Sequence, residues 1–198
     1  MKSKKYLFLF FAAALLCFSL YVYFQSNNRT DYKKLKTVST TNQKIAVDVP
    51  DQMQEVQAGL TTIDYEHRLQ NEKQSLISHI RVESQYFGKD VIDSARDEII
   101  KQLKAKNGEY YEIFKSKTNT NPAAKELSFN GFSDYKLGER DGVISDFSYK
   151  YEDAPVNGRL LVIFSEDTVY FMIAESTEEV WQDNLDIWQK SFESLRIS

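Results

Sequence analysis

The apolar segment at residues 6–24 is the feature that most constrains what this chain can become. Its sequence, YLFLFFAAALLCFSLYVYF, has no charged side chain, and Lys2, Lys4 and Lys5 precede it. A helix of this length is about 28 Å long, close to the roughly 30 Å of hydrocarbon in a bilayer. The preceding lysines favour a cytoplasmic N-terminus, although Arg29 and three further lysines follow the segment. Residues 1–24 are therefore predicted to form a single-pass anchor in the cell membrane, with the rest of the chain extracytoplasmic.

A cleavable signal peptide is the alternative interpretation of this segment. Cleavage needs small residues in an A-x-A-like arrangement near the end of the apolar run. Ala12–Ala14 lie too early, and at the end of the run Ser26 is paired with the bulky Phe24. Lipidation of Cys17 is disfavoured because Leu16 stands where a small residue is needed. An uncleaved signal-anchor is the preferred interpretation.

The sequence after the anchor divides into a linker and one domain. Residues 25–43 have no sustained apolar period and are predicted to be a polar linker, whereas residues 44–198 are long enough for one globular domain with its own core. Lys and Arg total 25 and Asp and Glu 29; three lysines and no acid lie in the anchor, so the remainder carries a net charge of −7. This charge argues against nucleic acid as a partner. The only cysteine lies in the anchor, so the domain must fold without a disulfide.

The first half of the domain predicts strands followed by a helix. Apolar residues alternate at 45–49, at 63–69 and at 76–87, which indicates half-buried strands. Asp90 is then a candidate N-cap for an amphipathic helix that continues to Leu103 and stops at Asn107-Gly108. A short strand is predicted at 110–114, and extended segments are predicted near 127–129 and 132–137.

The last third predicts a three-stranded meander and a closing helix. Alternating residues at 143–151 and the doubly apolar run at 159–164 are separated by Asn157-Gly158, a pair that favours a type I′ turn. A third strand is expected in VYFMIA. Ser176 and Glu179 then match a capping box, and an apolar stripe follows at helical spacing. The stripe consists of Trp181, Leu185, Trp188, Phe192 and Leu195. The element order therefore favours an α+β fold.

Over about residues 44–197 this pattern resembles the PsbP-like superfamily. The resemblance rests on the opening IAVDVP, on HIRVESQYF with the helix after it, and on Trp188, Ser191 and Phe192 near the end. It implies a central antiparallel β-sheet with helices on both faces, an α/β/α sandwich, here preceded by the transmembrane helix. Members of the family act mostly as non-enzymatic accessory or assembly subunits at membranes, and some bind metal ions weakly. No functional motif of the family can be placed residue by residue here.

Motifs for chemistry are scarce in the sequence. G-x-S-x-G, H-E-x-x-H, P-loop and G-x-G-x-x-G patterns are absent from it. His67 shares the apolar face of its strand and is predicted to be a hydrogen-bonded core or boundary residue, whereas His79 is predicted to be solvated. The acidic stretch with Glu139, Asp141 and Asp146 is predicted to be a solvated turn, with a cation site as the alternative. No catalytic residue, metal site or cofactor is predicted.

Tyrosines give a stronger functional indication than these motifs do. The chain is 14% aromatic, and strand alternation cannot bury all of its tyrosines. A surface that carries tyrosines favours a protein or glycan interface. The candidate interaction surface consists of Tyr110, Tyr111, Tyr135, Tyr149 and Tyr151. The favoured hypothesis is thus a membrane-anchored, non-enzymatic module that docks on an envelope protein.

The alternative hypothesis is a glycan- or cation-binding envelope protein, or a hydrolase that uses carboxylates. Its candidate groups are Asp134, Glu139, Asp141 and Asp146. Hydrolysis would require two of these acids to converge in a cleft, roughly 5 to 10 Å apart.

Overall fold

The computed structural model describes residues 30–68, 76–118, 125–151 and 153–198. The predicted anchor lies outside these residues, as does the start of the predicted linker. In the part of the chain that is described, no helix is both long and apolar enough to cross a membrane. Tyr32–Ser198 form one compact unit, to which all of the following description refers.

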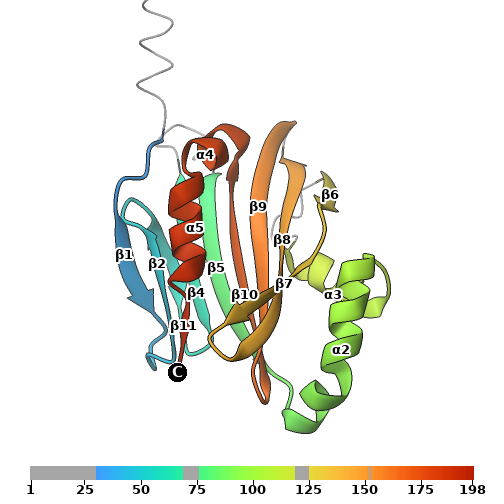
Figure 1. The fold of residues 1–198 in the computed structure, drawn as a ribbon. Coiled ribbons are helices and arrows are strands. Elements are labelled where there is room, and N and C mark those ends of the chain that lie inside the picture. Colours follow the sequence, from blue (N-terminus) through green and yellow to red (C-terminus); the bar gives the residue numbers. More distant parts are fainter. Residues whose placement is uncertain (1–29, 69–75, 119–124, 152) are drawn as a thin grey trace, which may run out of the picture. The chain divides into compact units, whose positions relative to one another are not determined.

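An antiparallel sheet of eight strands is the centre of this unit (Figure 1). The strand order is β3-β4-β5-β10-β9-β8-β6, and β7 also pairs with β8. The bounds are β3 Gln54–Ala58, β4 Thr62–Arg68, β5 Leu76–Tyr86, β6 Lys125–Phe129, β7 Ser133–Leu137, β8 Arg140–Tyr151, β9 Ala154–Phe164 and β10 Thr168–Thr177. The predicted meander is confirmed as β8-β9-β10, and β9 in its middle is buried on both faces from Leu160 to Phe164.

The C-terminal part of the predicted linker is a strand in a second, smaller sheet. This sheet has the order β1-β2-β11, with β1 at Leu35–Ser39, β2 at Ile45–Pro50 and β11 at Arg196–Ile197. β1 lies within residues 25–43, and Tyr32 just before it is 2% exposed. β1 is short and mostly polar, so its sequence has no apolar alternation that would predict a strand. Pairing with β2 over all five residues stabilises it instead. The folded domain therefore begins near Tyr32 and not at residue 44.

Two helices follow β5. The predicted amphipathic helix is confirmed as α2 (Lys89–Ala105), but its N-cap is Gly88 and Asp90 lies in its first turn. Gly88 has φ 89°, a conformation that other residues rarely adopt. The strand predicted at 110–114 is wrong, because this segment belongs to α3 (Glu109–Thr118). Its tyrosines, Ile113 and Phe114 favour strands locally, yet Tyr111, Phe114 and Thr118 are buried at helical spacing, so tertiary packing decides the structure.

The hairpin turn predicted at Asn157-Gly158 is also wrong. β9 runs straight through this pair, and β8 joins β9 where Tyr151 faces Ala154. Gly158 lies between Phe147 and Glu175 on the neighbouring strands. A Cβ at this position would collide with the Phe147 ring and the Ala174 carbonyl. The glycine is therefore required by close packing and not by a turn.

The closing helix is interrupted once. It consists of α4 (Glu178–Asp183) and α5 (Leu185–Glu193), with Asn184 between them. The predicted capping box is wrong: Thr177 is the N-cap of α4 and makes no capping hydrogen bond with its side chain. The aromatic stripe is buried as predicted at Trp181, Trp188, Phe192 and Leu195, whereas Leu185 is 48% exposed.

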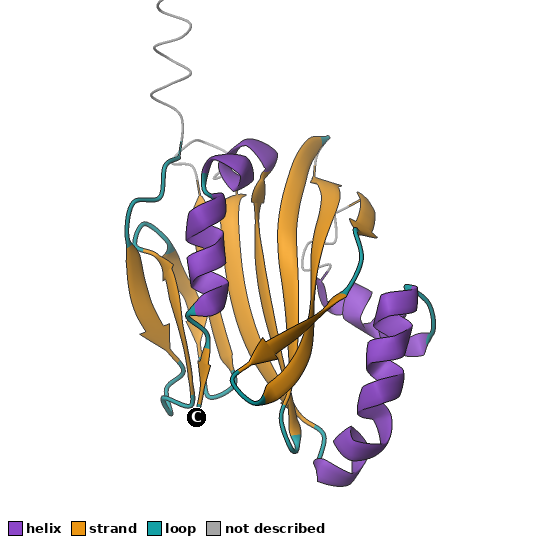
Figure 2. Ribbon diagram, viewed as in Figure 1, coloured by secondary structure: helices purple, strands orange, loops and turns teal. Residues whose placement is uncertain are grey.

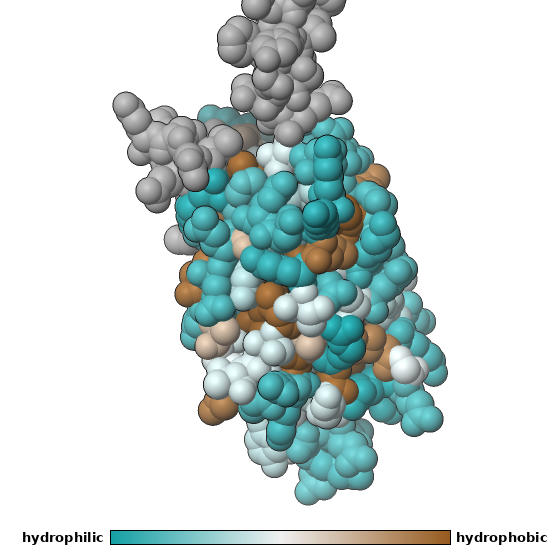
Figure 3. Space-filling model, turned by 90° about the vertical axis from the view of Figure 1, so that its left-hand side faces the viewer, coloured by the Kyte–Doolittle hydropathy of each residue, from teal (hydrophilic) through white to brown (hydrophobic). Residues whose placement is uncertain are grey.

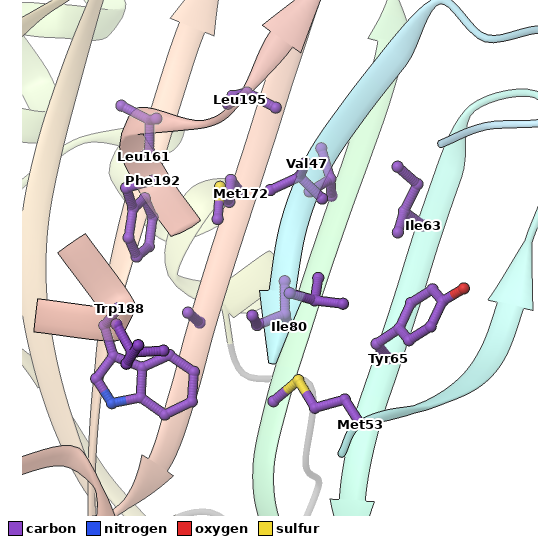
Figure 4. Close-up of a cluster of buried hydrophobic side chains, with 14 of the residues drawn as sticks. Val47, Met53, Ile63, Tyr65, Ile80, Leu161, Met172, Trp188, Phe192 and Leu195 are labelled. Carbon is purple, nitrogen blue, oxygen red and sulfur yellow. The ribbon is translucent and has the colours of Figure 1, made fainter. Parts of the chain in front are cut away.

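Helices cover both faces of the large sheet, as the PsbP-like resemblance implied (Figure 2). The face under α4, α5 and the small sheet is called the α5 face, and the face under α2 and α3 is called the α2 face. On the α5 face, Trp188 and Phe192 lie beside Leu161 and Met172 of the sheet, with Val47 of β2 and Ile80 of β5 nearby (Figure 4). A second core cluster fills the α2 face, mainly with aromatic and β-branched side chains.

Candidate functional site

The five tyrosines of the predicted interaction surface do not form one surface. Tyr111 and Tyr149 are buried in the core of the α2 face, at 8% and 6% exposure. Tyr110 and Tyr151 are half-buried against the same core, and Tyr135 packs against the core of the α5 face. Alternation along β8 places both Phe147 and Tyr149 inward, which explains why more tyrosines are buried than the sequence suggested. Tyr111 and Tyr149 are therefore not available to a partner in this structure.

The boundary role predicted for His67 is confirmed. Its Nδ1 lies 2.9 Å from the hydroxyl of Tyr32, which donates a 2.7 Å hydrogen bond to Ser78 Oγ. The Tyr32 backbone N–H also donates to Asn184 Oδ1 at 2.7 Å, and the Tyr32 ring meets Trp188 edge-on. Burial lowers the pKa of His67, so this imidazole is favoured in its neutral form. These contacts fix the start of the domain to the end of β5 that carries Ser78.

The solvated position predicted for His79 is wrong. The residue is 9% exposed on the α2 face, where its Nε2 lies 2.8 Å from Asp64 Oδ1 and its Nδ1 lies 3.2 Å from Glu175 Oε1. Tyr149 also hydrogen-bonds Glu175. Asp64 and Glu175 come from the strands on either side of β5, so the sequence around His79 gave no sign of them.

The protonation of this buried group follows from its neighbours. Burial favours the neutral imidazole, but the hydrogen bonds and charges of Asp64 and Glu175 outweigh burial and raise the pKa of His79 to about 9. Burial, together with the charge of Glu175, raises the pKa of the Tyr149 phenol as well. At neutral pH the imidazolium therefore lies between two carboxylates, an arrangement typical of a buried structural ion pair.

The four carboxylates of the hydrolase hypothesis do not gather in one place, and three of them pair with basic side chains. Asp134 pairs with Lys104 at 2.7 Å, Asp141 with Lys136 at 3.3 Å and Asp146 with Arg159 at 2.6 Å. Asp141 and Asp146 are an odd number of residues apart on β8, so they project from opposite faces of the sheet. Within the described ranges, no group of three or more His, Cys, Asp or Glu side chains is arranged to hold a metal ion. Glu139 and Asp141 both line an open, mixed-charge depression of about 630 Å³, together with Arg96 and Arg140.

A pocket of about 330 Å³ lies between the two helices of the α2 face and the sheet. It is called the apolar pocket. α2 contributes Val91, Ala95 and Ile99 to its lining, and α3 contributes Tyr110, Ile113 and Phe114. The sheet contributes Gln85, Val169 and Phe171, and Lys117 of α3 supplies a cation. Such a volume, with mostly apolar walls and a few polar groups, is typical of a binding site.

Large apolar side chains are also exposed around this pocket. Val91 is 49%, Ile113 43% and Phe87 41% exposed. These three residues are called the docking crescent, and all three line the apolar pocket. On the side of the molecule that Figure 3 shows, hydrophobic residues instead appear in several separate places among hydrophilic ones.

Sequence reasoning missed this site, although one signal was present. Of the predicted surface residues, only Tyr110 lines the apolar pocket. The apolar periodicity places Val91 on the buried face of a helix and Ile113 in a strand. It therefore does not indicate that either side chain is exposed. The signal was the excess of large apolar residues at 86–92 and 110–114, which is more than one helix face or one strand can bury.

The comparisons with known proteins identify the fold. The sequence matches no protein-family model and no curated protein. Cyanobacterial PsbP (CyanoP) from Synechocystis superimposes with a TM-score of 0.57 at 10% identity, over 83% of this chain and 92% of that one. LpqN of Mycobacterium tuberculosis superimposes with a TM-score of 0.52 at 13% identity, over 83% and 91%. The chain has a PsbP-like fold.

A longer protein is also similar to this PsbP-like domain. A structure from Bacteroides thetaiotaomicron aligns with 82% of this chain at 11% identity and a TM-score of 0.49, but this chain covers only 48% of that protein. At these identities the shared property is the fold. The PsbP-like scaffold places the apolar pocket at one end of β5 and Tyr32 at the other.

Proposed function

We propose that this protein is an extracytoplasmic accessory domain, tethered to the cell membrane by residues 1–24, that docks without catalysis onto another envelope protein through the docking crescent. Its PsbP-like fold supports a role of this kind, because LpqN, which shares the fold, is described as involved in cell envelope biogenesis. We expect no substrate turnover by the domain.

The observation that carries this proposal is the exposure of the crescent. Three large apolar side chains that line one pocket are exposed to solvent. Leaving such surface in water is unfavourable, by about 25 cal/mol for each Å² that a partner would cover. Contiguous apolar patches on a soluble domain mark interaction sites.

The position of the crescent in the domain suits docking by a tethered protein. Tyr32, where the chain enters the domain, contacts Ser78, while the crescent begins at Phe87, just after the other end of β5. An extended strand rises about 3.3 Å per residue, so the entry point and the crescent are roughly 25 Å apart. A tether that enters at Tyr32 would therefore leave the crescent free to meet a partner.

The state of the acidic side chains supports a non-catalytic role. The acids of the hydrolase hypothesis that lie on β7 and β8 are paired with Lys or Arg, and those on β8 point to opposite faces. Glycoside hydrolysis typically uses two carboxyl groups that flank the scissile bond. Glu139 and Asp141 do line one depression, but it is open and also lined by Arg96 and Arg140, so we place docking ahead of hydrolysis.

Copurification of a crosslinked partner from the native membrane tests the proposal. The full-length protein is compared with a Val91→Asp/Ile113→Asp variant, which places charges in the crescent, and with Val56→Asp as the matched control. Val56 is 54% exposed on the edge strand β3, outside the crescent. The proposal expects one reproducible envelope protein with the wild type and Val56→Asp, and its loss in the crescent variant. Equal capture by all three proteins, or capture of none, would overturn it.

A further inference from the structure

The apolar pocket has an aromatic interior. Phe114 and Phe171 form two of its walls with ring centroids 5.2 Å apart, and Phe87 and Tyr110 complete the aromatic lining. Aromatic rings prefer tilted or edge-on contacts with other rings, and such pairs contribute about 0.5–1.5 kcal/mol beyond the area that they bury. A volume of about 330 Å³ admits one large aromatic side chain and leaves little room for more.

One polar group of the pocket is an acceptor that lacks a hydrogen-bond donor. Gln85 lines the pocket, and its Oε1 is buried without a hydrogen-bond partner among the described residues. A buried acceptor left in this state costs about 1–3 kcal/mol. Lys117 does not need an anionic ligand, because its Nζ already lies 3.2 Å from Glu83 Oε1 and 5.1 Å from the centroid of the Phe171 ring.

We infer that the apolar pocket binds a tryptophan side chain of the docked partner, whose indole N–H donates a hydrogen bond to Gln85 Oε1. This inference rests on the proposed docking function and names the chemistry of the partner. Indole is a donor only and has a large apolar body, so it matches a pocket that offers aromatic walls and one unused acceptor. Phenylalanine and an acyl chain would fill the space but leave the acceptor unsatisfied.

Gln85 can reach such a ligand with little rearrangement. The terminal torsion of a glutamine side chain is broad, so the amide can turn its oxygen toward the pocket at small cost. Val91 and Ile113, which line the pocket and are 49% and 43% exposed, would then cover the edges of the ring. Tryptophan is also the residue type most enriched at the centres of protein interfaces, where it fills desolvated pockets of this kind.

Binding of soluble tryptophan derivatives to the full-length protein in lipid nanodiscs tests the inference. The probes are N-acetyl-tryptophanamide, its 1-methyl derivative without the ring N–H, and N-acetyl-phenylalaninamide. Methyl resonances of Ile99, Ile113 and Val91 report binding, because all three side chains line the pocket. We expect N-acetyl-tryptophanamide to shift these resonances and to bind at least about fivefold more tightly than the other two probes, as the loss of one hydrogen bond predicts.

A Gln85→Leu variant isolates the hydrogen bond. It should bind N-acetyl-tryptophanamide and the 1-methyl derivative equally, whereas the control Gln57→Leu, at an exposed position on β3, should keep the wild-type preference. Equal affinity of the two probes for the wild type would overturn the inference. Absence of shifts in the pocket methyl resonances would overturn it too. Displacement of N-acetyl-tryptophanamide by decanoate at a concentration below that of the tryptophan probe itself would also overturn it. In each of these cases the copurification with the crescent variant still decides the docking proposal separately.

Discussion

The two faces of the large sheet are closed in different ways. On the α5 face, Trp181 and Trp188 stack with centroids 5.4 Å apart, and Trp188, Phe192 and Leu195 are at most 3% exposed. On the α2 face, the helices enclose a pocket of about 330 Å³, and Val91 and Ile113 at its mouth stay open to solvent. Both faces therefore contribute a buried core, but the α5 face is closely packed whereas the α2 face leaves apolar side chains exposed at its pocket.

The largest expected effect comes from shortening the chain on the α5 face. A protein that begins at residue 44 lacks Tyr32 and β1, whereas one that begins at residue 30 keeps both. Losing one buried aromatic side chain costs about 3–5 kcal/mol, so the midpoint of thermal unfolding should fall by roughly 10 °C or more between the two. Circular dichroism melts measure this. Equal midpoints would mean that residues 30–43 are a linker after all.

Truncating Trp188 should have the next largest effect. Trp188→Ala leaves a cavity in the α5 face and should lower the free energy of unfolding by about 3–5 kcal/mol in urea titrations. Leu185→Ala is the matched control on the same helix, since Leu185 is 48% exposed, and it should change stability by no more than about 0.5 kcal/mol. Similar losses for both variants would contradict the assignment of the core.

The α2 face should make stability depend on pH through His79. Its pKa in the folded protein, about 9, lies above the ordinary 6.5. The stabilisation is therefore complete below pH 6.5 and is lost as the pH rises through 9, by about 1–3 kcal/mol. Urea midpoints between pH 6.5 and 9.5 should fall accordingly. A His79→Gln/Glu175→Gln variant should lack this slope and a Trp188→Phe variant should keep it; a wild type without the slope would show that His79 is neutral.

The smallest effect on stability is expected in the docking crescent. Val91 is 49% exposed, so Val91→Asp should change the free energy of unfolding by no more than about 0.5 kcal/mol while it abolishes partner capture. Urea titration and copurification on the same preparation measure both properties. A loss above 1.5 kcal/mol would show instead that Val91 belongs to the core of the α2 face.

Local patterns predicted the elements that carry their own signal. β2, β4 and β5 have the expected alternation, and α2 and the stripe from Trp181 to Leu195 have the expected helical spacing. The errors arose where distant residues decide the structure. α3 is a helix because of its packing, β1 exists because β2 pairs with it, and Gly158 continues a strand because Phe147 and Ala174 leave no room for a side chain there.

The candidate site was less predictable than the fold for the same reason. The apolar pocket joins Gln85 of β5, Ile99 of α2, Ile113 of α3 and Phe171 of β10, which only the folded chain brings together. His79 shows the same effect, since both of its carboxylate partners come from other strands. The tyrosine content predicts an aromatic surface, but Tyr111 and Tyr149 are buried in the core, and Phe87 is an exposed aromatic residue at the pocket.

Site-specific photo-crosslinking in the native membrane tests the central claim most directly. A photoreactive amino acid is placed in the full-length protein at Val91, at Ile113 or at Val56, one position at a time, and the adducts are identified by mass spectrometry. We expect the same envelope protein from Val91 and Ile113, joined through one segment of that protein, and no such adduct from Val56. Adducts of equal yield from all three positions, or adducts from Val56 alone, would contradict the assignment of the docking crescent as the binding face.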